Sequence, residues 1–400
     1  MSESTPHDVL VYNIRKRIRD RKLRIGFLVS DNTKWNASDL VKKVEAHTRM
    51  ECRIYHTLTG RDKDPQDRAR NFKTEGKFFS SLGVPYTPLY CEDSNTRNPL
   101  PYEEIDVLFL QQPWGMERIV KEINGKILLC YFHYGYLVYL NPAYQYNRPK
   151  FHPHIWTYFE QSDAHKKLHI QHADALPHHQ VVTGYPKLDV YLEPVNTENL
   201  PWPVDNSTKR VIYAPHHAFK NTKMRIATFE WNHDLLLSFA QQYPDISWVY
   251  RPHGRIKYTI TGAGFMSLAE YEDYEDSWGR LENALFYPTG SYFDLFRKSD
   301  ALITDSSSFL GEYLPTGKPV IWLKARKPNV KLNSIGKKIT DTYYQVSTRD
   351  ELLETFNRVI VDGDDYLLPS RHKIMNELFP PDRDSASNNI IQYLEEIFLD

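Results

Sequence analysis

The residues best suited to chemistry follow short apolar runs, at the points where those runs end. Five such endings carry His, Arg, Lys, Asp or Ser side chains: FHYGY (132–136), TGYPKLD (183–189), YAPHHAFK (213–220), RPHG (251–254) and TDSSS (304–308). In an open α/β sheet, ligands bind outside the carboxyl ends of the strands. If the apolar runs are parallel strands, at least three of these endings should meet in one cleft.

The last ending places Asp305 before three serines (306–308). Apolar residues within 309–314 recur at helical spacing and predict a helix that begins near Ser307 or Ser308. Asp305 and the serines would cap this helix by accepting from its unpaired N–H groups. Serine hydroxyls and free N–H groups at a helix N-terminus also suit a phosphate. The segment therefore predicts either a capped helix alone or an anion site, in which Asp305 orders the loop or accepts from a ligand hydroxyl.

Short apolar runs alternate with longer amphipathic stretches, which is typical of parallel sheets covered by helices. The first series of expected strands is 24–30, 52–58, 106–111, 126–132, 155–161 and 179–184, and the second is 210–215, 246–252, 284–288, 301–305, 319–323 and 342–347. A stretch with linker composition (192–210) separates the series. We therefore expect two doubly wound, Rossmann-like α/β domains facing a central cleft, namely residues 1–195 and residues 205–400 with a final amphipathic helix.

The composition excludes several classes of protein. A chain of 400 residues is long for one core, and a net charge of −1 means that any anion site must be local. The three cysteines are too few for a disulfide framework and indicate reduced thiols. No run reaches the roughly 18–20 apolar residues of a membrane span, and no signal peptide is recognisable. We therefore expect a cytoplasmic protein.

The segment IRKRIRDRKLR (14–24) is strongly basic. It is either the solvated face of an N-terminal helix or a patch that contacts the inner face of the cell membrane. No other basic face is evident, which argues against nucleic-acid binding.

In chain order, the five endings resemble the motifs of the CDP-glycerol glycerophosphotransferase family, the teichoic-acid primases and polymerases with related capsule enzymes. That family shows HGT, GYPR.D, YAPT, PHP and TDYSS…FD…GKP, where this chain has FHYGY, TGYPKLD, YAPHH, RPHG and TDSSSFLGEYLPTGKPV (304–320). The chain departs from the family at four points. Tyr134 separates His133 from Gly135, and His216 stands in place of Thr. Ser306 stands in place of Tyr, and Glu312 stands in place of Asp.

The resemblance implies a GT-B architecture and a transferase. The enzyme would move glycerol phosphate, or a related alditol phosphate, from a CDP-activated donor to a hydroxyl of a cell-surface glycan or lipid-linked acceptor, and release CMP. It also implies that no metal and no cofactor is needed, because side chains and a helix N-terminus offset the phosphate charge.

The resemblance further implies residue roles. His133 would be the general base that takes the acceptor proton, a task that suits an imidazole of pKa about 6.5. His253 would contact the donor phosphates or the leaving group, beside Arg251. The remaining residues implied on the donor side are His216, Lys220, Asp305, Ser306, Ser307, Ser308 and Glu312.

Several assignments have a structural alternative. His133 could be a buried histidine bonded to a backbone carbonyl, His253 could be packed in the fold, and Arg251 could form a surface salt bridge. Asp189 is better explained as fixing an interdomain loop than as a chemical group. Histidines 165, 169 and 172 at helical spacing, with 152 and 154, permit a metal site, but their neighbours indicate an exposed polar helix face.

Two other functions are compatible with the same fold. A GT-B glycosyltransferase would move a sugar from a UDP, GDP or CMP donor in capsule, lipopolysaccharide or cell-wall synthesis, and Glu312 would then hold ribose or sugar hydroxyls. A non-catalytic scaffold in a polymer-assembly complex would keep the fold alone. The joint presence of His133, His253 and the segment TDSSS (304–308), which we call the serine loop, argues against the scaffold.

Overall fold

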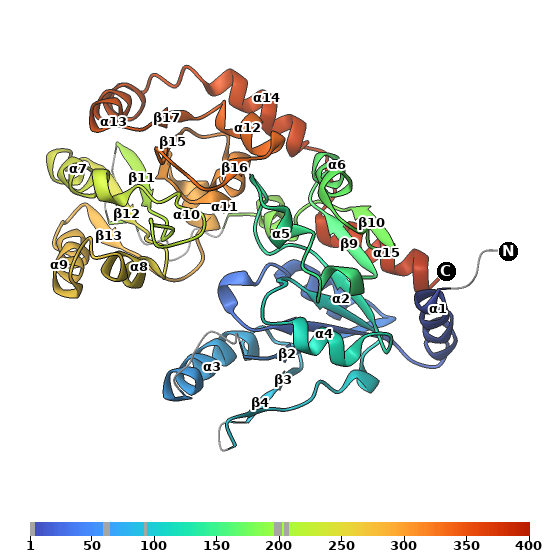
Figure 1. Ribbon diagram of the computed structural model, residues 1–400. Coiled ribbons are helices and arrows are strands. Elements are labelled where there is room, and N and C mark those ends of the chain that lie inside the picture. The colour runs from blue at the N-terminus through green and yellow to red at the C-terminus, as the bar shows by residue number, and fades with distance from the viewer. Residues whose placement is uncertain (1–4, 59–64, 92–93, 196–201, 204–207) are drawn as a thin grey trace. The chain divides into compact units, whose positions relative to one another are not determined.

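The computed structural model describes residues 5–58, 65–91, 94–195, 202–203 and 208–400 (Figure 1). The chain forms two compact units. The first unit comprises Met1–Gly135, Pro142–Leu192 and Asp384–Asp400, and the second comprises Tyr136–Asn141 and Glu193–Arg383. Much of the expected linker, residues 196–201 and 204–207, lies outside the described residues.

The first unit is built on a seven-stranded sheet. Its strands in spatial order are β10 (His179–Val182), β9 (Thr157–Glu160), β7 (Leu128–Tyr131), β6 (Val107–Leu110), β1 (Leu23–Val29), β2 (Met50–His56) and β3 (Tyr86–Pro88). Every pairing in this sheet is parallel. The strand order reverses between β1 and β6. Beside the sheet, β4 (Tyr90–Cys91) and β5 (Thr96–Arg97) form a short antiparallel pair.

Both faces of this sheet are covered by helices. Phe27 of β1 and Phe109 of β6 pack on the face covered by α1 (Pro6–Arg17), α2 (Ser38–Ala46) and α15 (Ala386–Phe398). The next residues, Leu28 and Leu110, pack on the opposite face against α4 (Glu117–Ile123). The remaining helices are α3 (Pro65–Ser80), α5 (Pro142–Gln145) and α6 (Asp163–His172). Burial on both faces explains why the strands are continuous apolar runs in the sequence.

The second unit is built on a six-stranded parallel sheet. Its spatial order is β13 (Ala284–Phe286), β12 (Ile246–Tyr250), β11 (Lys209–Ala214), β14 (Ala301–Thr304), β15 (Val320–Leu323) and β17 (Tyr344–Val346). This is the order 3-2-1-4-5-6 of a Rossmann sheet, which reverses between its first and fourth strands. A short strand β8 (Tyr139–Leu140) pairs antiparallel with β16 (Lys331–Leu332) and so attaches Tyr136–Asn141 to this unit.

The helices of the second unit are α7 (Phe229–Gln242), α8 (Ile256–Gly262), α9 (Leu268–Gly279), α10 (Phe293–Lys298), α11 (Ser307–Glu312), α12 (Ser334–Thr340), α13 (Arg349–Phe356) and α14 (Leu368–Leu378). Side chains of α7, α9 and α13 form one apolar core with alternate residues of the strands, including Tyr213, Trp248 and Ile303. The α/β fold with parallel sheets is therefore confirmed, and each of the twelve expected strands overlaps an observed one.

The last helix, α15, was expected in the second domain but belongs to the first unit. Asp189 explains its position. The carboxylate of Asp189 accepts from the backbone N–H groups of Ala386 (2.8 Å) and Ser387 (2.9 Å) and from the Ser387 hydroxyl (2.6 Å), at the start of the helix. The apolar side chains of α15 then enter the first unit's core. The expected role of Asp189 in an interdomain loop is corrected to anchoring this helix.

Part of the basic segment (14–24) contacts a buried acid, Asp106. Asp106 is fully buried, and the guanidinium of Arg21 binds its carboxylate through two hydrogen bonds of 2.6 and 2.8 Å. Arg17 and Arg24 lie 3.6 Å from the same carboxylate. Three arginines of the segment therefore neutralise one buried acid. Among the helices within the described ranges, none has the length and apolar character needed to cross a bilayer.

Candidate functional site

The carboxyl ends of β11 and β14 meet where the second sheet reverses its order, and Asp305 joins them. Its buried carboxylate accepts from the backbone N–H of His216 (2.5 Å), from the backbone N–H of Thr228 (2.6 Å) and from the Thr228 hydroxyl (2.7 Å). Burial raises the pKa of Asp305 to about 7, although these hydrogen bonds act in the opposite direction. Asp305 thus orders the YAPHH loop, one of the two roles expected for it.

The RPHG segment (251–254) also lies next to the end of β11. The N–H of Arg251 donates to the Tyr213 carbonyl (2.8 Å), and the N–H of His253 donates to the Pro215 carbonyl (3.0 Å). These bonds continue the β11–β12 pairing beyond the strands. Three of the five endings, YAPHH, RPHG and TDSSS, therefore converge within the second unit.

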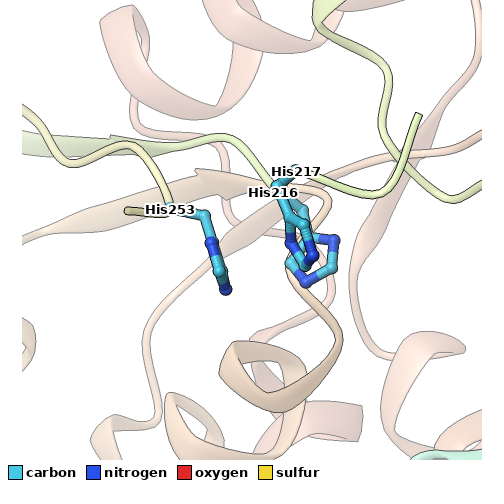
Figure 2. A group of neighbouring side chains, drawn as sticks. All are labelled: His216, His217 and His253. Carbon is cyan, nitrogen blue, oxygen red and sulfur yellow. The ribbon is translucent and has the colours of Figure 1, made fainter. Parts of the chain in front are cut away.

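The convergence brings three histidine rings together (Figure 2). The rings of His217 and His253 stack with centroids 4.0 Å apart, and His216 lies 4.5 Å from His217 and 5.0 Å from His253. We call His216, His217 and His253 the three-histidine cluster. His216 is 7% exposed, and the other two are half-buried.

The backbone holds two of these rings in one tautomer. The N–H of Ala218 donates to His216 Nδ1 (3.2 Å), and the N–H of Arg255 donates to His253 Nδ1 (3.1 Å). A neutral imidazole that accepts at Nδ1 carries its proton on Nε2. Burial and the neighbouring His253 and His217 hold the pKa of His216 well below its usual value, so its ring is neutral at pH 7. The Nε2–H groups of His216 and His253 are therefore donors that suit phosphate oxygens.

The same cluster has the spacing of a metal site, because its ligand atoms lie within 4.8 Å of one another. Metal-bound histidines almost always donate their other ring N–H to a carboxylate, carbonyl or water. In His216 and His253 that other nitrogen instead accepts a backbone N–H. The hydrogen bonds to Nδ1 therefore favour an anion over a cation at the cluster.

Arg251, two residues before His253, and Glu312 each form hydrogen bonds with other parts of the second unit. The guanidinium of Arg251 donates to the carbonyls of Tyr287 (3.2 Å), Thr289 (3.3 Å) and Gly290 (2.7 Å), and it lies over the rings of Tyr287 and Tyr292. The fully buried carboxylate of Glu312 accepts from the Tyr292 hydroxyl (2.6 Å). Arg251 therefore orders the loop after β13 through backbone carbonyls, instead of forming a carboxylate salt bridge.

The serine loop agrees only in part with its expected structure. α11 begins at Ser307, and Leu310, Tyr313 and Leu314 are buried as expected. The predicted capping by Asp305 is wrong, because its carboxylate binds His216 and Thr228, and no side chain caps the helix. Among the described residues, the hydroxyls of Ser306, Ser307 and Ser308 make no hydrogen bond to the protein; Ser306 is buried, and the other two are half-buried. Lys220 is exposed at the end of the YAPHHAFK segment.

His133 lies in the first unit, just beyond the end of β7. It is 8% exposed, and burial lowers its pKa to about 4, against the hydrogen bond to Gly135, which raises it. His133 Nδ1 lies 2.9 Å from the Gly135 carbonyl oxygen and 3.1 Å from the Gly135 N–H. The contact with a backbone carbonyl was the structural alternative considered for this residue, and it is compatible with a base because it involves only Nδ1.

The TGYPKLD segment contacts the FHYGY segment that contains His133. The Tyr185 hydroxyl donates to the Tyr134 carbonyl (2.6 Å), so two of the five endings are joined in the first unit as well. The ring of Tyr134, which interrupts the family's His-Gly pair, stacks on His133 with centroids 4.8 Å apart. Tyr134 therefore packs against the candidate base instead of displacing it.

The histidines of α6 do not form a metal site. His169 Nδ1 lies 2.5 Å from a carboxylate oxygen of the buried Glu160, and His165 Nδ1 lies 2.8 Å from the Ser162 hydroxyl. Both rings are buried, contrary to the expected exposed polar face. Within the described ranges, the three-histidine cluster is the only group of His, Cys, Asp or Glu residues with metal-ligand spacing.

Sequence reasoning did not assign His217 or Thr228 to the site. His217 follows His216 directly, but its stacking on His253 depends on the pairing of β11 with β12. Thr228 lies at the start of α7 and shows no motif of its own. Only the strand order reveals that these residues meet.

Comparison with known proteins agrees with this geometry. Residues 142–328 match the model of the family described as CDP-glycerol:poly(glycerophosphate) glycerophosphotransferase. This segment contains the three-histidine cluster and the serine loop, whereas His133 precedes it. The predicted resemblance and the prediction of a transferase are confirmed. No curated protein sequence is significantly similar to the chain.

Solved structures share the fold at low identity. The wall teichoic acid polymerase TagF is 13% identical, with a TM-score of 0.57 over 98% of this chain and 93% of that one. UDP-GlcNAc 2-epimerase from Neisseria meningitidis, bound to UDP-GlcNAc, is 14% identical, with a TM-score of 0.60 over 94% of this chain and 100% of that one. The glycosyltransferase SnogD from Streptomyces nogalater is 12% identical, with a TM-score of 0.50 over 94% and 99% of the chains. These likenesses confirm the GT-B-like fold.

Proposed function

We propose that this chain, whose residues 142–328 match the CDP-glycerol glycerophosphotransferases, transfers glycerol phosphate or a related alditol phosphate from a CDP-activated donor to an acceptor hydroxyl. The observation that carries the proposal is the three-histidine cluster, which lies inside the matched segment where the second sheet reverses its strand order. Ligands of α/β sheets bind at such points.

The donor phosphates would bind to neutral donors at this point. The Nε2–H groups of His216 and His253 would donate to phosphate oxygens, and His217 would add a third imidazole. The hydroxyls of Ser306, Ser307 and Ser308 would complete the shell, and Lys220 would supply a cation at its edge. Arg251 and Asp305 would hold the loops in position, because their polar groups are bound to backbone atoms.

The chemical step would be attack on the phosphorus that carries the glycerol group. His133 Nε2 would take the proton of the acceptor hydroxyl as its oxygen forms the new P–O bond. The bond from that phosphorus to the bridging oxygen would break, and CMP would leave with the bonding electrons. The low pKa of His133 keeps the ring neutral, which is the form that a base requires.

The acceptor would be a glycan or lipid-linked chain end. The solvent-exposed basic residues near the N-terminus, Lys16, Arg19 and Lys22, would contact an anionic membrane surface if the acceptor is lipid-linked. Because Arg17, Arg21 and Arg24 face Asp106, this contact would use fewer charges than the sequence suggests.

A nucleotide-release assay tests the proposal. Purified protein is offered CDP-glycerol, CDP-ribitol and UDP-GlcNAc separately, with a lipid-linked or oligosaccharide acceptor. We expect CMP from a CDP-alditol and no UDP. Release of UDP, with both CDP donors inert, would replace the proposal with glycosyl transfer on the same fold.

A further inference from the structure

The environment of His133 includes a side chain from the neighbouring strand. Gln161 follows β9, which pairs with β7, the strand that precedes His133. The buried Gln161 side chain donates from Nε2 to the Gly135 carbonyl oxygen (2.8 Å), and the same oxygen lies 2.9 Å from His133 Nδ1. A backbone carbonyl oxygen has two lone pairs, so it can accept from Gln161 and from His133 at once.

Two hydrogen bonds compete for Nδ1 of His133. The Gly135 N–H, 3.1 Å away, would make Nδ1 an acceptor and place the ring proton on Nε2. The Gly135 carbonyl, 2.9 Å away, requires the proton on Nδ1 and leaves the Nε2 lone pair free. The first arrangement, with a backbone N–H donating to Nδ1, is also present at His216 and His253, and it makes Nε2 a hydrogen-bond donor. Only the second arrangement produces a base.

The backbone around His133 is fixed independently of this choice. Asn36 donates from Nδ2 to the His133 carbonyl (3.1 Å), and its own N–H donates to Gln111 Oε1 (3.1 Å). The Tyr134 ring packs on the imidazole. The Gly135 carbonyl oxygen is the atom that links the Gln161 side chain to the His133 ring.

We propose that Gln161 is a positioning residue for the general base. Its side-chain amide holds the Gly135 carbonyl against His133 Nδ1, so that the ring proton stays on Nδ1 and Nε2 accepts the proton of the acceptor hydroxyl. The catalytic part rests on the function proposed above, whereas the tautomer is a property of the fold and can be measured without substrate.

The tautomer is tested by ¹⁵N NMR of protein labelled at histidine, because the shifts of ring nitrogens separate protonated from unprotonated atoms. The His133 signals are assigned by difference with His133→Asn. In the wild-type protein we expect protonated Nδ1 and unprotonated Nε2. In Gln161→Met, which keeps the side-chain length but cannot donate, we expect the proton to move partly or wholly to Nε2. Gln392→Met, at an exposed position on α15, is the matched control.

If Gln161→Met does not fold, a second variant tests the same contact. Gln161→Glu keeps the shape and polarity, but an ionised carboxylate cannot donate to the Gly135 carbonyl. In both variants we expect kcat for CMP release to fall about tenfold, the scale of one lost hydrogen bond, with the KM for the donor unchanged. For Gln161→Glu we also expect the acidic limb of the pH–rate profile to move to higher pH, because a nearby negative charge favours imidazolium.

The outcomes separate the two proposals. A wild-type His133 protonated on Nε2, or an unchanged tautomer in both folded Gln161 variants, would overturn this inference even if His133 is needed for CMP release. The expected tautomer change without CMP release from any donor would leave this inference intact and contradict the proposed function.

Discussion

Asp305 accepts the backbone N–H of His216 at 2.5 Å, and this one contact joins the ends of β11 and β14 where the second sheet reverses. The same carboxylate also binds Thr228 twice. An acid that the sequence places beside three serines therefore shapes the YAPHH loop and does not cap the helix that follows the serines.

Asp305→Asn should destabilise the protein by about 1–3 kcal/mol, because an amide nitrogen would face an N–H donor that now has a carboxylate oxygen. The unfolding free energy, measured by urea denaturation, gives this value. Asp382→Asn, at an exposed position before α15, is a control for loss of charge.

The same acid predicts a pH dependence of stability. The folded-state pKa of Asp305 is about 7, above its ordinary value of 3.8. Between these values the folded protein binds a proton that the unfolded chain does not, so stability should fall as pH rises from 3.8 to about 7. Urea denaturation across this range should show a shallower fall for Asp305→Asn than for the wild type. Parallel curves for the two proteins would contradict the assignment.

His133→Asn should reduce kcat for CMP release by about 10²–10⁴-fold, the usual contribution of a general base. Donor affinity should be unchanged, because His133 is proposed to act on the acceptor. In the wild type, kcat/KM should fall as pH is lowered through about 4 and should show no step from this group near pH 6.5. Loss of donor affinity in His133→Asn would show that His133 contacts the donor instead of the acceptor.

His216→Phe and His217→Phe should each weaken binding of CDP-glycerol about tenfold, since each removes a ring N–H but keeps an aromatic ring in the stack. Isothermal titration measures the dissociation constant. His372→Phe, at an exposed position on α14, is the control. If the His217 variant binds as the wild type does, then His217 only packs against His253.

Removal of metal ions should not weaken donor binding at the three-histidine cluster. The prediction follows from the tautomers of His216 and His253, whose Nδ1 atoms accept backbone N–H groups. The dissociation constant of CDP-glycerol is compared before and after dialysis against a chelator. A large loss of affinity that added Zn²⁺ restores would show that the cluster binds a cation.

Arg21→Ala should lower the free energy of unfolding by about 1.5–3 kcal/mol, because the fully buried Asp106 loses two charge-assisted hydrogen bonds. Lys22→Ala, at the adjacent exposed position, should change it by less than about 0.5 kcal/mol. Equal effects would show that the segment has no specific partner.

Much of the fold was predictable because both sheets are parallel and covered on two faces. Their strands are therefore continuous apolar runs with polar endings, as at Thr304–Asp305. The strand β3 was missed because it has three residues and ends in a proline. The placement of α15 was also missed, because Asp189 and Ser387 interact across almost 200 positions of the sequence.

The site was predictable as a set of residue types but not as a geometry. The strand endings identified His133, His216, His253 and the serines. The stacking of His217 on His253 and the contact of Gln161 with Gly135 depend on which strands are neighbours. A sequence gives no local signal for such contacts, because each partner lies on a separate strand.

The central claim is that the three-histidine cluster binds the phosphates of a CDP-activated donor. The most direct test is isothermal titration of CDP-glycerol and of CMP into the wild type and into His253→Phe. We predict that His253→Phe loses about tenfold in affinity for CDP-glycerol and much less for CMP, which lacks the second phosphate. Equal affinity of the two proteins for CDP-glycerol would contradict the account.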